Sequence, residues 1–300
     1  MINYTCFINI LNIKFQPPKE YKMKKLRFIL MLILMPLFFA ACTTVDTNPN
    51  AASPSPTLDR IVTRGELIVG TAGSMPPLNM TTKEGKVIGL EPDIAGFIAA
   101  SMGVKLTLKT MEFKQLLPAL EAGQIDMIMS DMTMTGKRNL KVAFVGPYFI
   151  SGKSILTKNA EIAAIEKGSD LNKPDFSLTA LAGSTSQQVV DGLLPDAKFI
   201  PANDYNQAVK MVLDGKVDAM VADYPICLIS VFRFPGHRLA TTIKPFTYEP
   251  IGIALPGNDP LMVNWLHNFF VSFKGSGELE RLTRKWLENG DWVKDLPEIK

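Results

Sequence analysis

A pattern that occurs twice, 92 residues apart, constrains the fold more than any other feature of this sequence. Each copy has apolar residues at helical spacing, a glycine, a mostly apolar strand and an aspartate at the end of that strand. The first copy lies in Leu116–Arg138, and its Gly123 and Asp131 return as Gly215 and Asp223. The glycines are placed to end a helix in the left-handed conformation.

The two copies predict two similar α/β lobes. Asp126 in the first strand matches Asp218 in the second, and both strands are otherwise apolar, as strands buried on both faces are. Polar residues follow each strand at its carboxyl end, which is where open α/β sheets bind small ligands. We therefore expect a ligand in a cleft between the lobes.

Composition argues against a nucleic-acid-binding protein. The chain of 300 residues carries a net charge of +3, but residues 1–42 hold six of the 32 Lys/Arg and one of the 29 Asp/Glu. Residues 43–300 therefore have 26 basic and 28 acidic residues, a charge of −2. A basic electrostatic footprint is not indicated.

The cysteines and histidines give no metal-binding pattern. Cys6, Cys42 and Cys227 have neither a metal-ligand spacing nor an obvious disulfide pattern, and His237 and His267 stand alone. We expect no metal and no cofactor, with structural or surface roles for both histidines.

Residues 1–42 are predicted to be an upstream extension followed by a signal peptide. Met23 is followed by three basic residues and an apolar run from Leu26 to Phe39. Phe39-Ala40-Ala41-Cys42 resembles the lipobox of bacterial lipoproteins, which predicts lipidation at Cys42, although Phe39 stands where an aliphatic residue is usual. An ordinary secretory signal with an incidental cysteine is the alternative. Residues 43–57, rich in Thr, Asn, Ser and Pro, are predicted to be a flexible tether.

The order of elements predicts a discontinuous first lobe. We expect lobe 1 to comprise residues 58–150 and 246–300, and lobe 2 residues 151–245. The Gly183–Ser186 segment precedes a predicted helix in lobe 2, where free backbone N–H groups suit an anion; simple capping of that helix is the alternative. The other expected elements are a strand at Glu66–Gly70, a helix at Asp93–Met102 with Ile94, Phe97 and Ile98 inward, a strand at Val104–Leu108, and helices at Pro260–Phe273 and Glu278–Asn289.

The chain resembles the family 3 periplasmic solute-binding proteins of ABC importers, the polar amino-acid binding group. The resemblance rests on FKQLLPALEAGQIDMIMSDMTMTGKR followed by FVGPYF, on AGSTSQ and on DGKVDAMVADYP, in that order, and covers about Leu58 to Trp292. It implies a type II periplasmic binding protein fold: two α/β lobes joined by two crossover strands that form a hinge.

The resemblance also implies a ligand site. Arg138 matches the arginine that binds the α-carboxylate of the ligand, an assignment that suits a guanidinium fork. Asp223 matches the acid that pairs with the α-ammonium. The other residues placed at the ligand by the resemblance are Ser130, Asp131 and Thr133 in lobe 1, Ser184 and Thr185 in lobe 2, and Phe113 as an aromatic wall.

Three of these residues have simpler alternative roles. Arg138 could be a surface residue beside Lys137, Asp223 could cap the turn that follows it, and Phe113 could be core. Two departures from the family concern the side-chain pocket: Ala72 stands where many relatives have an acid, and Met75, also expected at the ligand, stands where an aromatic lid is common. They favour a neutral α-amino acid over a cationic one.

The predicted function is that of a lipid-anchored, monomeric receptor in the periplasm or at the cell surface. It would capture an amino acid or related small compound, deliver it to an ABC transporter permease, and catalyse no reaction. One alternative is an enzyme of the same fold similar to the cyclohexadienyl dehydratases, for which Glu91 and Glu249 are available carboxylates that the sequence does not place in the cleft. Another is the ligand-sensing component of a signalling system.

Overall fold

A computed structural model of the protein describes residues 55–299, which belong to one compact unit, Ala52–Lys300. The predicted signal peptide, the Cys42 lipidation site and most of the predicted tether lie outside the described residues. Within the described residues, none of the helices has the length and apolarity that crossing a membrane requires.

The end of the predicted tether is corrected by the structure. Pro56 and Thr57 are the first residues of helix α2 (Pro56–Arg64), and both Thr57 and Ser55 are buried. Asp259 holds them, because its carboxylate accepts hydrogen bonds from the Ser55 hydroxyl and the Thr57 backbone N–H, each at 2.7 Å. The contact joins residues more than 200 positions apart, so local composition gave no sign of it.

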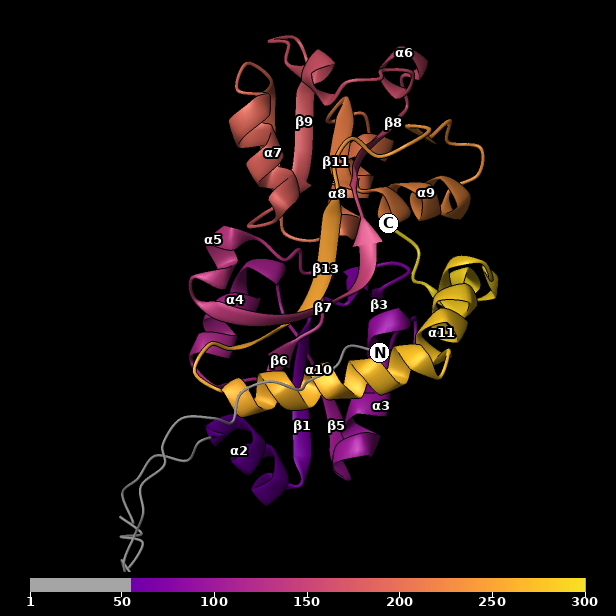
Figure 1. The fold of residues 1–300 in the computed structure, drawn as a ribbon. Helices are drawn as coiled ribbons and strands as arrows, with labels where there is room; N and C mark the ends of the chain where they lie inside the picture. The colour runs from indigo at the N-terminus through magenta and orange to yellow at the C-terminus, as the bar shows by residue number, and fades with distance from the viewer. Residues whose placement is uncertain (1–54, 300) are drawn as a thin grey trace, which may run out of the picture. The chain divides into compact units, whose positions relative to one another are not determined.

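The first lobe is built on a five-stranded sheet with the order β5-β1-β6-β13-β7 (Figure 1). Strand β1 runs parallel to β5 and β6, whereas β13 is antiparallel to β6 and β7. Three short strands, β2-β3-β4, form a small separate sheet. The bounds are β1 Glu66–Thr71, β2 Ser74–Met75, β3 Asn79–Thr81, β4 Val87–Ile88, β5 Lys105–Thr110, β6 Met127–Ile128, β7 Val142–Ser151 and β13 Glu249–Pro256.

The second lobe repeats this arrangement with the order β10-β9-β11-β8-β12. Strand β9 is parallel to β10 and β11, and β8 is antiparallel to β11 and β12. In both sheets the parallel strands therefore end at one edge, and polar residues follow them there. The bounds are β8 Lys153–Thr157, β9 Ser177–Leu181, β10 Lys198–Ala202, β11 Ala219–Asp223 and β12 Ala240–Thr241.

Helices follow most of the strands, as the sequence pattern predicted. The helix predicted at Asp93–Met102 starts earlier than expected, because it begins at Leu90, immediately after Gly89. The bounds are α3 Leu90–Met102, α4 Phe113–Glu121, α5 Gly136–Asn139, α6 Ala160–Ala163, η1 Gly168–Leu171, α7 Thr185–Leu193, α8 Tyr205–Leu213, α9 Tyr224–Arg233, α10 Pro260–Gly275, α11 Glu278–Leu287 and η2 Asp291–Asp295.

The repeat predicted from the sequence is present in the structure. Gly123 and Gly215 have φ angles of 68° and 70°, so both end their helices in the left-handed conformation. Strand β6 is short: residues 125–129 are all buried, but only Met127 and Ile128 belong to the ladder. Burial of both faces, and not the number of ladder residues, is what the apolar run encoded.

The two lobes are joined where β7 leads through Gly152 into β8 and where residues 242–248 lead back into β13 (Figure 1). The predicted pair of crossovers is therefore confirmed. One hydrophobic cluster spans both sheets: Phe113 and Ile128 of the first lobe pack in the same cluster as Leu181 and Met220 of the second.

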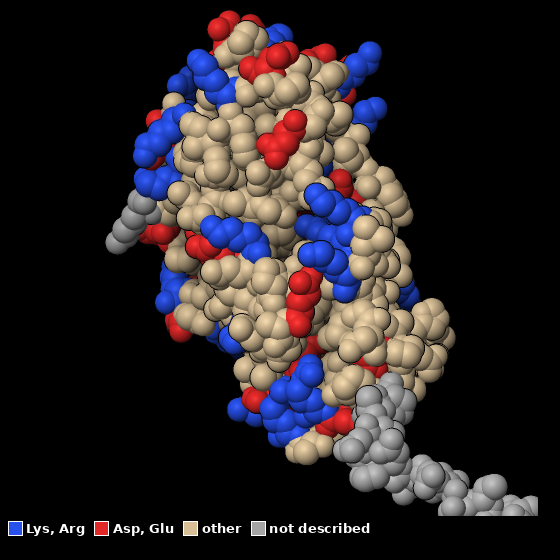
Figure 2. All heavy atoms as spheres, turned by 90° about the vertical axis from the view of Figure 1, so that its left-hand side faces the viewer, with Lys and Arg blue, Asp and Glu red and all other residues tan. Residues whose placement is uncertain are grey.

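The core of the first lobe agrees with the amphipathic pattern except at Phe97. Ile94 and Ile98 are buried in the first-lobe core, but Phe97 is 37% exposed and its ring lies 5.2 Å from that of Phe273. On the face of the molecule shown in Figure 2, Lys and Arg side chains lie among Asp and Glu side chains, in keeping with the near-neutral charge of residues 43–300.

Candidate functional site

The structure brings the nine predicted ligand-site residues of the described chain to the strand ends of both sheets, and all nine are buried. Several sit at element boundaries, where the backbone turns away from the sheet. Met75 ends β2, Phe113 begins α4, Ser130, Asp131 and Thr133 follow β6, Arg138 lies in α5, Ser184 and Thr185 begin α7, and Asp223 ends β11.

Arg138 is not a surface residue. Its side chain is 7% exposed and lies over the Phe113 ring, with 5.5 Å between the guanidinium carbon and the ring centroid. The short helix α5 places it, because the Thr135 hydroxyl accepts a hydrogen bond from the Arg138 backbone N–H at 3.2 Å. One guanidinium nitrogen, Nη1, donates to the Thr133 carbonyl at 2.8 Å. The other, Nη2, is buried and has no hydrogen-bond partner.

Asp131 and Asp223, the matching aspartates of the repeat, face the same site from opposite lobes. Each has a buried carboxylate oxygen, Oδ1, without a hydrogen-bond partner. Burial raises the pKa of Asp131 well above its ordinary value, and the nearby charge of Asp223 raises it further. Asp131 also has a φ of 48°, a left-handed conformation that is uncommon for residues other than glycine, although aspartate adopts it more often than most.

Asp223 does not cap the turn that follows it. It occupies the N-cap position of α9, but its side chain makes no capping hydrogen bond. Instead, its Oδ2 accepts a hydrogen bond at 2.7 Å from the ammonium of Lys153, which is 2% exposed. The antiparallel register of β8 and β11 places Lys153 directly opposite Asp223.

Two threonines connect the lobes at the site. The hydroxyls of Thr133 and Thr185 are 3.2 Å apart, and the Thr185 hydroxyl also donates to Glu249 Oε2 at 3.2 Å. Ser184 caps helix α7, which is the alternative role that the sequence left open. Its hydroxyl accepts from the Gln187 backbone N–H at 3.2 Å and so caps helix α7.

Ser130 and Met75 line the first-lobe side of the site but are engaged locally. The Ser130 hydroxyl accepts a hydrogen bond from the Ala72 backbone N–H at 2.8 Å and lies 3.7 Å from the Met75 sulfur. Phe113 belongs to the hydrophobic cluster that spans both sheets, and the Arg138 guanidinium lies over its ring, so it is a core residue that also contacts the site arginine.

Sequence reasoning missed Lys153 altogether and did not place Glu91 or Glu249. All three are buried at the site. The Glu249 carboxylate lies 3.5 Å from the Lys153 ammonium, and Glu91 Oε1 accepts a hydrogen bond from the Asp131 backbone N–H at 2.7 Å. One sign was available for Lys153: a lysine at the start of the apolar strand KSILT must either snorkel to water or meet an acid.

The charged groups of the site are suited to binding rather than to metal coordination. Among residues 55–299 no cluster of three or more His, Cys, Asp or Glu side chains could hold a metal ion. Three charged groups of these residues have a buried side-chain atom without a partner, Arg138, Asp131 and Asp223. An unpaired buried charge is costly, so these atoms favour a ligand that carries the complementary charges.

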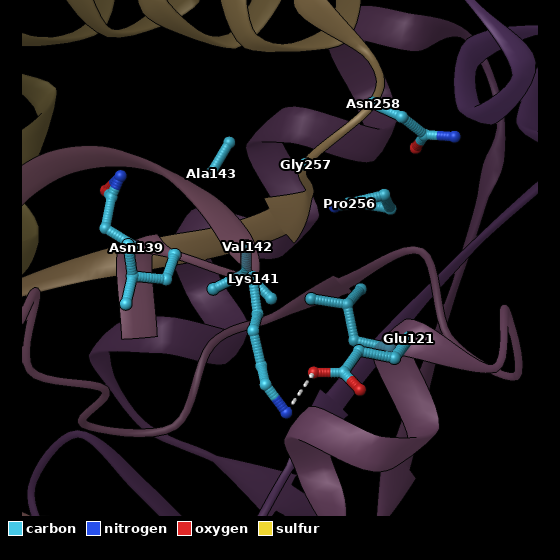
Figure 3. Close-up of a pocket in the computed structure, with 10 residues that line it drawn as sticks. Glu121, Asn139, Lys141, Val142, Ala143, Pro256, Gly257 and Asn258 are labelled. Atoms are coloured by element: carbon cyan, nitrogen blue, oxygen red, sulfur yellow. Dashed lines mark ion pairs between the residues drawn. The ribbon is translucent and has the colours of Figure 1, made fainter. Parts of the chain in front are cut away.

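A hollow on the first lobe does not coincide with this site. It has a volume of about 580 Å³ and is lined by Leu120, Glu121, residues 139–143 and residues 256–258. Figure 3 shows its side chains, with an ion pair of 3.8 Å between Lys141 and Glu121. Both partners are exposed, and none of the lining residues has a buried polar atom without a partner, so nothing there resembles the charge arrangement at Arg138.

Comparison with known proteins agrees with the resemblance drawn from the sequence. The chain is 28% identical to the ABC transporter glutamine-binding protein GlnH of Bacillus subtilis (strain 168), covering 89% of this chain and 98% of that protein. It is 25% identical to the cyclohexadienyl dehydratase of Pseudomonas aeruginosa, covering 83% and 92%. A putative binding component of an ABC transporter from Wolinella succinogenes DSM 1740, solved in complex with lysine, matches with a TM-score of 0.73 and 34% identity over 77% of this chain and 99% of that one.

These similarities confirm the two-lobed type II periplasmic binding protein fold. A family model matches residues 67–289, which include every residue of the candidate site. The chain therefore belongs to the bacterial extracellular solute-binding proteins, family 3.

Proposed function

We propose that this extracytoplasmic solute-binding protein captures a free α-amino acid between its lobes and delivers it to the membrane permease of an ABC transporter. The observation that supports the amino acid is the set of three buried charged atoms without partners. Arg138 Nη2 needs an acceptor, as a carboxylate provides, and Asp131 Oδ1 and Asp223 Oδ1 need a donor, as an ammonium provides. An α-amino acid carries both groups on one carbon.

Delivery of the ligand to a permease is proposed because of the relatives and not because of a surface of this chain. GlnH of Bacillus subtilis is named as a binding protein of an ABC transporter, and it is matched over 98% of its length. Hydrolysis or rearrangement of the ligand is not part of the proposal. The protein would return its ligand chemically unchanged, and it would act as a monomer.

A thermal-shift screen tests the proposal. Residues 43–300, with Cys42 absent, would be screened against the twenty amino acids, their simple derivatives and cyclohexadienyl acids. A ligand at 100 times its Kd adds about 2.7 kcal/mol to the free energy of unfolding. Arg138→Ala should weaken binding of the hit by about 100-fold, since the ligand carboxylate would be left without its charged partner.

Lys137→Ala is the matched control, because Lys137 is the exposed neighbour of Arg138. It should bind the ligand as the unchanged protein does. A screen without any amino-acid hit, or a hit whose affinity is the same in Arg138→Ala, would overturn the proposal.

A dehydratase of the same fold is the second candidate, and two observations favour it. The dehydratase of Pseudomonas aeruginosa is a relative, and Glu91 and Glu249 are buried at the site, where sequence reasoning did not place them. Against it, both oxygens of each carboxylate already have partners within the protein. A cyclohexadienyl acid that is consumed on incubation, with aromatic absorbance appearing, would select this alternative.

We also propose that Cys42 is lipidated and anchors the protein to a membrane, on the strength of the Phe39-Ala40-Ala41-Cys42 segment. In cells that make the full chain, Cys42→Ser should shift the protein from the membrane fraction to the soluble or secreted fraction. A protein that fractionates identically with and without Cys42 would contradict the anchor.

A further inference from the structure

Lys153 is a cation built into the ligand site. It is the first residue of β8, a strand whose five residues are all buried. Burying an ammonium is costly unless acids surround it, and Lys153 has two: Asp223 Oδ2 at 2.7 Å and Glu249 Oε2 at 3.5 Å. Its backbone N–H is fixed as well, since it donates to the Thr247 hydroxyl at 2.9 Å.

The acids keep Lys153 charged. Burial by itself disfavours the ammonium, but the charges of Asp223, Glu249 and Asp131 outweigh that effect and raise the pKa of Lys153 above its ordinary value. Lys153 is therefore positively charged at neutral pH, and it belongs to the second lobe, whereas Arg138 belongs to the first.

This cation limits what the acids of the site can still bind. Glu249 is engaged at both oxygens, by the Thr247 hydroxyl at 3.0 Å and by Thr185 and Lys153.

Glu91 is also engaged at both oxygens, by Asn79 Nδ2 at 2.6 Å, by the Asp131 backbone N–H at 2.7 Å and by the Tyr148 hydroxyl. Among the described residues, the buried carboxylate oxygens without a partner are Asp131 Oδ1 and Asp223 Oδ1. Two oxygens suffice for one ammonium, which has three donors, but they leave no buried acid for a second cation on the ligand.

We propose that Lys153 is a specificity-determining residue: its ammonium pairs with Asp223 Oδ2 and Glu249 Oε2, so that the site accepts the single ammonium of an amino acid with an uncharged side chain and rejects lysine and arginine. This inference rests on the proposed amino-acid function. It differs from what the Wolinella succinogenes neighbour would suggest by analogy, since that protein was solved with lysine.

The test compares the ratio of two dissociation constants by isothermal titration calorimetry, that for lysine over that for the neutral amino acid bound best in the screen. Residues 43–300 are used, which include the whole compact unit Ala52–Lys300. In the unchanged protein the ratio should exceed about tenfold, and in Lys153→Met it should fall by about tenfold or more, because Asp223 Oδ2 and Glu249 Oε2 lose the lysine ammonium and become available to the side-chain cation.

Two variants separate a role in specificity from a role in folding alone. Lys153→Arg keeps the charge and should restore the ratio of the unchanged protein. Lys105→Met removes a lysine whose side chain is 78% exposed, on β5, and should leave the ratio as it was.

Should Lys153→Met fail to fold, Glu249→Gln supplies the same information from the other partner. Removing this acid while Lys153 stays makes the site more positive, so the dissociation constant of glutamate relative to that of isosteric glutamine should fall by about fivefold or more. An unchanged ratio would count against the assignment.

The failures of the two proposals are distinguishable. Amino acids that bind with a lysine-to-neutral ratio near one, or with a ratio that Lys153→Met does not change, would overturn the role of Lys153 and leave the amino-acid function intact. No binding of any amino acid by the unchanged protein would overturn both.

Discussion

At the scale of single residues, the site is defined by charges that the protein buries without fully pairing. Arg138 donates to a carbonyl and rests on an aromatic ring but keeps one nitrogen free, and Asp131 and Asp223 each keep one oxygen free. Sequence reasoning identified these three side chains, because the repeat marks the two aspartates and the family resemblance marks the arginine. It could not tell that Asp223 shares its carboxylate with Lys153.

Ligand binding should release a proton from Asp131, because burial raises the pKa of its carboxyl in the folded protein. Its folded-state pKa is raised, so between its ordinary pKa of about 4 and the raised value the folded protein holds a proton that the unfolded chain does not. Folding stability therefore falls, and the affinity for a ligand ammonium rises, as the pH increases through that window. Calorimetric titration in two buffers of different ionisation enthalpy measures the released proton.

Asp131→Asn should abolish the proton release, and Asp204→Asn is the control. Asp204 is a helix-capping acid on α8, whose carboxylate accepts from the Gln207 backbone N–H at an exposed position. Identical binding enthalpies in the two buffers for the unchanged protein would contradict this prediction.

At the scale of elements, the repeat fixes how each buried strand meets its neighbour. In the first lobe the Asp126 backbone N–H donates to the Ile68 carbonyl and its carboxylate accepts from the Ile68 N–H, both at 2.8 Å. In the second lobe Asp218 makes the same pair of bonds with Ser177, at 2.8 and 2.7 Å. The two copies differ in burial, since Asp126 is fully buried and Asp218 is exposed.

That difference predicts unequal effects of the same substitution. Asp126→Ala should lower the free energy of unfolding by about 2–4 kcal/mol, because Arg60, Arg64 and the Ile68 N–H all lose a buried carboxylate. Asp218→Ala should lower it by about 1 kcal/mol, since water replaces most of what is lost. Urea unfolding of the two variants makes the comparison, and equal losses would show that burial does not decide the contribution.

At the scale of the whole unit, two crossover segments and a shared hydrophobic cluster hold the lobes together. The crossovers pack closely at Gly152, where an added Cβ would lie 2.2 Å from the Thr247 carbonyl and 2.6 Å from the Pro245 side chain. Across the site, Thr133 of one lobe contacts Thr185 of the other. We expect the crossovers to act as a hinge, so that the lobes close on the ligand.

Closure predicts a smaller radius of gyration by X-ray scattering when the amino acid is added. Gly152→Ala should weaken ligand binding by about fivefold or more and reduce the contraction, because the crossovers cannot approach each other past the new methyl group. Gly192→Ala is the control, since a Cβ at Gly192 would meet nothing within 4 Å. An unchanged profile on ligand addition, or normal contraction in Gly152→Ala, would refute the hinge.

The sequence alone determined the features that depend on local pattern: the repeated helix-strand unit, the glycines that end its helices, and the polar strand ends that carry Asp131 and Asp223. The tertiary structure decided the features that depend on pairing between distant segments. Lys153 meets Asp223, 70 positions away, only because the antiparallel register of β8 and β11 sets them opposite each other. A strand pattern encodes which residues are buried, but the partner that neutralises a buried charge is chosen by the register, and no local periodicity records it.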